Sequence, residues 1–132
     1  MSNYPQSGSN WWPSDGESGL NTDKVDEWVI TPRELRRRLD RGEPLALVDV
    51  RERWEADIVS LPGSRLIPIN ELGYRADDEI DPDEEIVLYC HHGIRSMEAA
   101  IVLWDLGYEH VKSLAGGIDR WILEVDPSLP RY

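Results

Sequence analysis

The sequence contains a single cysteine, Cys90, among its 132 residues. One cysteine cannot form a disulfide within the chain, so it is either an inert core residue or a reactive thiol. The chain has only three histidines, His91, His92 and His110. With no second cysteine, this set does not support a closed metal site of the usual ligand number, and we expect no bound metal.

Long apolar runs are also lacking, and none approaches the length that spans a bilayer. Residues 1–19 have no basic region followed by an apolar stretch, which argues against a secretory signal. We therefore expect a soluble cytoplasmic protein without a membrane segment.

Positive charge is scarce, because 14 Lys and Arg face 26 Asp and Glu and the net charge is −12. Such a balance disfavours nucleic acid and anionic membrane surfaces as partners. The basic residues form one local cluster: Arg33, Arg36, Arg37, Arg38 and Arg41. We interpret this cluster as the solvated side of a helix, with a docking surface for an acidic partner as the alternative.

Composition divides the chain into two parts. Residues 1–23 are rich in Ser, Asn, Gly, Pro and Asp and lack an apolar period, which predicts a flexible N-terminal tail. The Trp11-Trp12 pair within it either lies against the folded body or forms a partner-docking motif. Residues 24–132 have enough apolar residues for one folded domain.

Two near-continuous apolar runs, residues 45–50 and 85–89, are typical of strands buried on both faces. Shorter strands are predicted at residues 28–30 and 111–114. Strands that alternate with helical patterns indicate an α/β domain with a mainly parallel sheet.

Apolar residues recur at helical spacing after Cys90, which predicts a helix with a buried face: Ile94, Met97, Ile101 and Trp104. Trp54 and Trp121, like Trp104, are expected in or beside the core. The acidic stretch 71–85 is interpreted as a solvated connection without the ligand spacing of a calcium site.

Cys90 follows a predicted strand and precedes a helix that begins near Arg95. Ligands of parallel sheets bind beyond the carboxyl ends of the strands, where this cysteine falls. A loop that leads into a helix turns backbone N–H groups toward one point and stabilises an anion there. Gly93 permits the backbone angles of such a loop, and Arg95 adds a permanent charge. This environment suits a cysteine nucleophile.

At these residues the sequence resembles the rhodanese homology domain, a sulfurtransferase family. Four segments in family order carry the resemblance: Leu47-Val48-Asp49-Val50-Arg51-Glu52, Leu61-Pro62-Gly63-Ser64 leading to Ile67-Pro68, Cys90-His91-His92-Gly93-Ile94-Arg95-Ser96, and Gly116-Gly117-Ile118-Asp119-Arg120-Trp121. The resemblance implies a rhodanese-like α/β fold, with a central, mainly parallel five-stranded sheet and helices on both faces.

The resemblance also implies a two-step reaction, in which Cys90 takes sulfur from a donor as a persulfide and an acceptor then removes it. The implied substrate-binding residues are those of the loop: His91, His92, Gly93, Ile94, Arg95 and Ser96. Their backbone amides would cradle the terminal sulfur, and Arg95 would help to hold an anionic donor. No cofactor is implied. The expected partners are thiosulfate or a persulfide as donor, and a sulfur-relay protein.

Two details of the loop refine this expectation. Neutral imidazoles at His91 and His92 hold a dianion less well than a basic residue would, which makes a persulfide at least as favoured a donor as thiosulfate. In the family, the segment with Asp49 and Arg51 approaches the loop from beneath, which implies a supporting role.

Two other functions stay open at this point. The same fold serves non-catalytic interaction or regulatory modules, although these would not need Cys90, Gly93 and Arg95 together. Related dual-specificity phosphatases have a seven-residue loop, whereas Cys90 to Arg95 spans six residues, which suits sulfur better than phosphate.

Overall fold

The computed structural model describes residues 27–132 of the chain. The predicted tail, the Trp11-Trp12 pair and the first residues assigned to the domain lie outside the described residues. The strands are β1 (Val29–Ile30), β2 (Ala46–Asp49), β3 (Arg65–Leu66), β4 (Ile86–Tyr89) and β5 (Val111–Leu114). The helices are α2 (Pro32–Asp40), α3 (Arg53–Ile58), α4 (Ile69–Glu79), α5 (Ile94–Asp105) and α6 (Gly117–Glu124).

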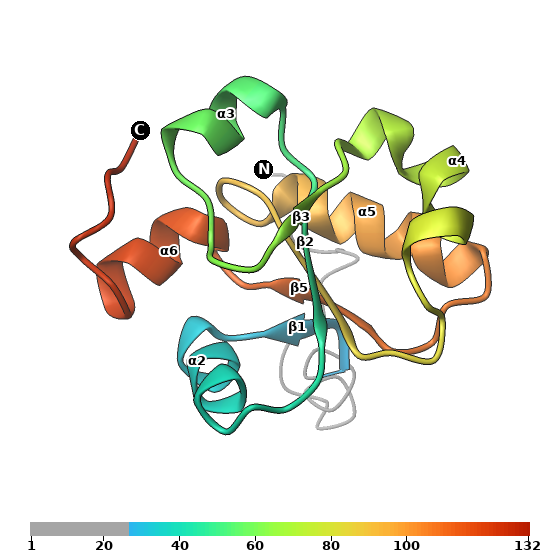
Figure 1. The fold of residues 1–132 in the computed structure, drawn as a ribbon, viewed down its shortest axis with the longest axis horizontal. Coiled ribbons are helices and arrows are strands. Elements are labelled where there is room, and N and C mark those ends of the chain that lie inside the picture. The colour runs from blue at the N-terminus through green and yellow to red at the C-terminus, as the bar shows by residue number, and fades with distance from the viewer. Residues whose placement is uncertain (1–26) are drawn as a thin grey trace, which may run out of the picture.

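The five strands form one sheet in the order β1-β5-β4-β2-β3, and every pairing is parallel. The apolar runs of β2 and β4 lie at its centre, where Val48 pairs with Leu88. One apolar cluster joins α4 and α5 to one face, and a second joins α2 and α6 to the other. Figure 1 shows these helices around the central strands. The predicted α/β class with a five-stranded parallel sheet is therefore confirmed.

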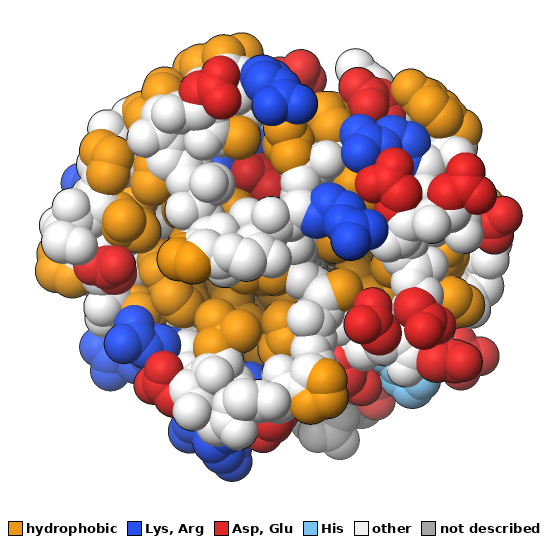
Figure 2. Space-filling view, viewed as in Figure 1, with side chains coloured by type: hydrophobic (Ala, Val, Ile, Leu, Met, Phe, Trp, Pro, Cys, Tyr) orange, Lys and Arg blue, Asp and Glu red, His pale blue; other side chains and the backbone are white. Residues whose placement is uncertain are grey.

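The prediction for the acidic stretch 71–85 was wrong, because most of it forms α4. Leu72 and Ala76 of this helix are fully buried in the core. Its outer face is acidic, and Arg75 pairs with Glu71 and Glu79, one turn away on either side. The many acidic residues of this segment made its few apolar positions hard to recognise in the sequence. Those positions are buried because α5 packs against them. In Figure 2 the acidic side chains gather on the right, over α4 and the loop that follows it.

The helix α5 was predicted correctly, but its buried face was not. Ile94 and Ile101 are 68% and 48% exposed, so the larger apolar side chains do not mark the core side. The buried residues of this helix are small ones together with one leucine: Ser96, Ala99, Ala100 and Leu103. Small side chains let the helix lie close to the sheet, which the count of large apolar residues could not reveal.

The arginine cluster lies on α2 and its C-terminal end, as expected. Ion pairs with Glu34, Asp40 and Glu43 are formed by four of its members: Arg36, Arg37, Arg38 and Arg41. Trp121 is buried, and Trp104 packs against the core. Trp54 is 60% exposed, which corrects the expectation of a core position. No membrane-spanning helix is found within residues 27–132, where no helix has the length and apolar composition needed to cross a membrane.

The start of α6 is pressed against the loop that follows β4. The backbone N–H groups of Ile118 and Asp119 donate to the carbonyl oxygens of Cys90 and His91, at 2.9 and 3.1 Å. Gly117 makes this approach possible, because a Cβ atom there would lie 2.3 Å from the His91 oxygen. Its φ of +64° also disfavours any side chain.

We expect Gly117→Ala to lower the free energy of unfolding by more than about 2 kcal/mol, since left-handed strain adds to a backbone clash. Gly107→Ala is the matched control, because φ there is +102° but no atom lies within 4 Å of the added Cβ. Strain alone should cost this control about 1 kcal/mol. Urea unfolding of both variants gives the comparison, and equal losses would show that the contact with the loop is unimportant.

Candidate active site

Cys90 lies directly after β4 and is 1% exposed. Its Sγ accepts hydrogen bonds from the backbone N–H groups of Gly93, at 3.1 Å, and Ser96, at 3.3 Å. The hydroxyl oxygen of Ser96 lies 3.5 Å from the same sulfur. Backbone donors aimed at one sulfur stabilise it when it carries negative charge. Of the loop amides expected to converge on Cys90, those of Gly93 and Ser96 are directed at its sulfur.

The loop that provides these amides is held from two sides. Gly93 precedes α5 with a φ of +105°, and a Cβ there would lie 3.2 Å from the backbone nitrogen of Gly116. Ser96 at the start of α5 bonds through its hydroxyl to Ser113 of β5, at 2.7 Å, and to the Gly93 carbonyl, at 3.3 Å. The amides are thus preorganised before any substrate arrives.

The remaining loop side chains differ in exposure. Ser96 is buried, His91, Gly93 and Arg95 are partly buried, and His92 and Ile94 are exposed. The predicted loop residues therefore lie around Cys90 as one continuous segment, but its side chains face different surroundings.

His91 is enclosed in an aromatic stack. Its ring lies 3.9 Å from the ring of Tyr132 on one side and 3.9 Å from that of His92 on the other. Its Nε2 is buried without a hydrogen-bond partner among the described residues. Burial is the main cause that lowers the pKa of His91, so the imidazole is neutral at pH 7.

Arg95 does not point freely into solvent. Its two terminal nitrogens donate to both carboxylate oxygens of Glu55 in α3, at 2.7 and 2.8 Å. Glu55 is 3% exposed. The hydrogen bonds from Arg95 are the main cause that lowers the pKa of the Glu55 carboxyl to about 2.

Glu55 is the main residue of the site that sequence reasoning missed. It lies in α3, three residues after the end of the first family-like segment. No spacing in the sequence links it to Arg95, 40 residues later. A partly buried arginine needs an anionic partner, but this requirement alone does not identify which carboxylate in the sequence is that partner.

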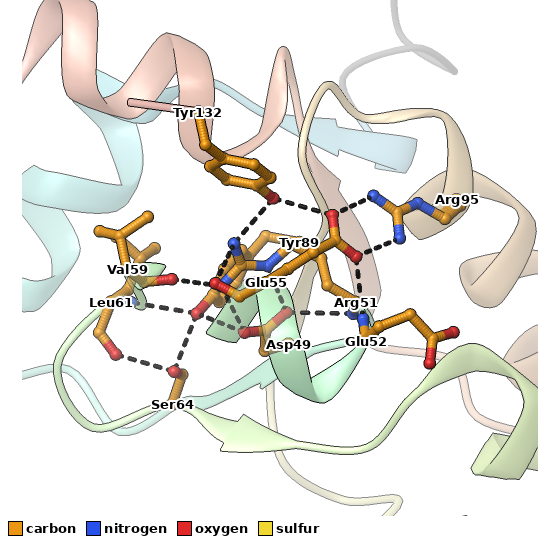
Figure 3. A network of polar contacts seen from close by, with 10 residues as sticks. All are labelled: Asp49, Arg51, Glu52, Glu55, Val59, Leu61, Ser64, Tyr89, Arg95 and Tyr132. Atoms are coloured by element: carbon orange, nitrogen blue, oxygen red, sulfur yellow. Dashed lines mark hydrogen bonds and ion pairs between the residues drawn. The ribbon is translucent and has the colours of Figure 1, made fainter. Parts of the chain in front are cut away.

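A second ion pair lies beneath the first. Arg51 is fully buried and forms a double hydrogen bond with Asp49, at 2.7 and 2.8 Å. It also donates to the Val59 carbonyl, at 2.6 Å, and to the Tyr132 hydroxyl, at 2.9 Å. That hydroxyl donates to Glu55 at 2.9 Å. Figure 3 shows how Tyr132 joins the two ion pairs into one network.

One group in residues 27–132 has the composition of a metal site: His91, His92 and Asp119, whose ligand atoms lie within 4.8 Å of one another. The carboxylate of Asp119 already accepts two hydrogen bonds from Arg131, at 2.9 and 3.2 Å. The two imidazole rings are stacked face to face, 3.9 Å apart with an interplanar angle of 28°, whereas two ligands of one ion direct their in-plane lone pairs at a common point. The arrangement does not fit a metal site.

Comparison with known proteins agrees with this geometry. The family model for the Rhodanese-like domain matches residues 31–124. The chain is 40% identical over 105 residues to the probable adenylyltransferase/sulfurtransferase MoeZ of Mycobacterium tuberculosis, a match that covers 79% of this chain and 27% of MoeZ. It thus spans about a quarter of the length of that relative.

Two solved structures show the same fold. The rhodanese-related protein of Thermoplasma volcanium has a TM-score of 0.67 and 31% identity, over 74% of this chain and 93% of that one. The human single-domain sulfurtransferase TSTD1 has a TM-score of 0.65 and 29% identity, over 73% of this chain and 96% of that one. The site residue Tyr132 lies beyond the segment that the family model matches.

The Glu55–Arg95 pair predicts how stability depends on pH. The folded-state pKa of Glu55, about 2, is below the value of 4.5 for a free carboxyl. Its contribution is therefore complete above pH 4.5 and is lost as the pH falls toward 2. We expect wild-type protein to lose about 3 kcal/mol more than Glu55→Gln over this range. Urea unfolding at several pH values measures this difference, and parallel curves would contradict it.

Proposed function

The chain belongs to the rhodanese-like domain family, and on that premise we propose that it is a sulfurtransferase that carries sulfane sulfur on Cys90. The observation that carries the proposal is the pair of backbone amides, of Gly93 and Ser96, directed at the Sγ of a buried cysteine. The sulfurtransferase names of MoeZ and human TSTD1 support it.

In the first step the Cys90 thiolate attacks the outer sulfur of a donor. A new S–S bond forms to Cys90, and the bond between that sulfur and the rest of the donor breaks, with its electron pair leaving on the donor fragment. Thiosulfate would leave as sulfite, and a persulfide would leave as a thiolate. In the second step a nucleophilic acceptor attacks the outer sulfur and returns the Cys90 thiolate. No net oxidation occurs, and no cofactor is needed.

The residues from His91 to Ser96 have separate roles in this proposal. The amides of the loop hold the negative charge of the terminal sulfur on the persulfide. Arg95 lies at the rim of the loop, where both of its terminal nitrogens donate to Glu55 and its charge is compensated. Because Cys90 is 1% exposed, only a small terminal atom such as sulfur reaches it easily. The burial of Cys90 and the six-residue loop both disfavour a phosphoryl group.

Partners are proposed from the relatives. MoeZ and the Candida albicans protein UBA4 are named adenylyltransferase and sulfurtransferase, which suggests a sulfur relay to or from another protein. We propose that this chain exchanges sulfur with such a protein or with a small persulfide in the cytoplasm, where a lone thiol stays reduced.

The alternative is an interaction module with the same fold. Such a module requires no reactive sulfur and gives no reason for backbone amides directed at the Sγ of Cys90. Sulfur uptake separates the two functions, because a pure interaction module would take up none.

We expect incubation with thiosulfate or an alkyl persulfide to add one sulfur atom to the intact protein, and cyanide to remove it as thiocyanate. Intact-mass spectrometry measures both steps. Cys90→Ala should take up no sulfur and should reduce thiocyanate formation to the uncatalysed rate. Because Cys90 is the only cysteine, the variant is a complete blank. Uptake by the variant, or none by folded and reduced wild type, would contradict the proposal.

A further inference from the structure

The positive charge of Arg95 is compensated by Glu55. Both terminal nitrogens face both oxygens of Glu55 in a fork-to-fork arrangement, at 2.7 and 2.8 Å. Bidentate, charge-assisted pairs of this kind are stronger than neutral hydrogen bonds. A donor that paired with both terminal nitrogens in the same bidentate geometry would have to displace Glu55.

Glu55 cannot easily turn away from Arg95. Its Oε1 also accepts from the backbone N–H of Glu52, at 2.9 Å, and its Oε2 accepts from the Tyr132 hydroxyl, at 2.9 Å. The side chain is 4% exposed, so water would replace few of these bonds. Hydrogen bonds from three groups therefore hold the Glu55 carboxylate in this position.

The other charges near the loop are also compensated. Arg51 is paired with Asp49, and the Asp119 carboxylate is paired with Arg131. His91 has a lowered pKa and is neutral, and the exposed His92 lies 3.9 Å from Asp119. Arg51, Arg95 and Arg131 thus each have a carboxylate partner, so the backbone amides of the loop act on a substrate without competition from an uncompensated arginine.

We propose that Glu55 is a specificity-determining positioning residue, which neutralises Arg95 so that the site favours a donor of low charge, an organic persulfide, over the thiosulfate dianion. This inference rests on the proposed sulfurtransferase function. Two amides directed at one sulfur can stabilise the single negative charge of a persulfide. Thiosulfate carries a second negative charge, and no uncompensated arginine is available to stabilise it.

The favoured reaction is balanced without a further reagent. The Cys90 thiolate attacks the outer sulfur of R–S–S–H, and the donor S–S bond breaks with its electron pair on the inner sulfur. The proton passes to the departing thiolate, which gives R–S–H and a Cys90 persulfide anion. The same step on thiosulfate releases sulfite and brings the charges of the thiolate and the dianion together.

Glu55→Gln tests the inference through a gain of activity. The neutral amide leaves the charge of Arg95 uncompensated and allows its guanidinium to turn to the donor. We expect kcat/KM for thiosulfate, relative to that for 2-hydroxyethyl persulfide, to rise about tenfold, mainly through KM. The rise should shrink at high ionic strength, because exposed charge interactions are screened. A purely structural Glu55 would lower both activities together.

Asp57→Asn is the matched control. Asp57 is exposed on the same helix, and its substitution changes the net charge of the protein by the same amount. The donor ratio of this variant should stay within about twofold of wild type, because distant surface charges are screened. A rise equal to that of Glu55→Gln would attribute the effect to net charge and overturn the inference.

The double variant Glu55→Gln/Arg95→Gln keeps the test decisive if the single variant folds poorly, because it removes both members of the ion pair. We expect its donor ratio to return to within about twofold of wild type. A tenfold loss of thiosulfate use in the double variant would show that Arg95 holds the donor in wild type, and would overturn the inference. If wild type transferred sulfur from neither donor, the proposed function itself would fail.

Discussion

The site depends on the hydrogen bonds and the ion pair that the buried guanidinium of Arg51 forms. A fully buried charge must be paired and hydrogen-bonded, because an unpaired one costs several kcal/mol. Asp49 at the end of β2 supplies the charge, and the Val59 carbonyl after α3 and the Tyr132 hydroxyl supply further bonds. Satisfying one side chain therefore ties the end of a central strand to α3 and to the last residue of the chain. Because Tyr132 and α3 also determine the position of Glu55, the same requirement reaches Arg95 in the loop.

The parallel sheet explains why the reactive residue lies where it does. Asp49 and Tyr89 are paired in register as the last residues of β2 and β4, so the residues that follow them emerge at the same edge. The Tyr89 hydroxyl bonds to Asp49, Ser64 and the Leu61 backbone, at 2.9–3.1 Å, and closes the underside of the network. Above it, the start of α6 closes on the loop through Gly117. The backbone around the Cys90 thiol is thus held in place by the sheet and by α6.

The charges of the site suit a particular kind of chemistry. Where each side-chain cation has a carboxylate partner, the attraction for a substrate falls to backbone amides, which stabilise one sulfur atom well and a large anion poorly. The overall charge of −12 acts in the same direction, because it disfavours the approach of multiply charged anions. A relay of sulfur between thiols brings little charge to the site, which makes it compatible with both features.

The residues near Cys90 in the chain were predictable from the sequence, because the chemistry of a strand, a glycine-containing loop and a helix start is local. The parallel sheet was predictable for a similar reason, since the runs that became β2 and β4 are apolar almost throughout. The spacing of apolar residues did not predict burial where burial depends on a neighbouring element. In α5, Ile94 is exposed and Ala99 is buried. The helix α4 was missed because its acidic residues outnumber its buried ones, such as Leu72. Only the tertiary structure decided that Glu55 and Tyr132 belong to the site. Arg95 is 40 residues from one and 37 from the other along the chain, and three-dimensional packing alone determines which carboxylate a partly buried arginine meets.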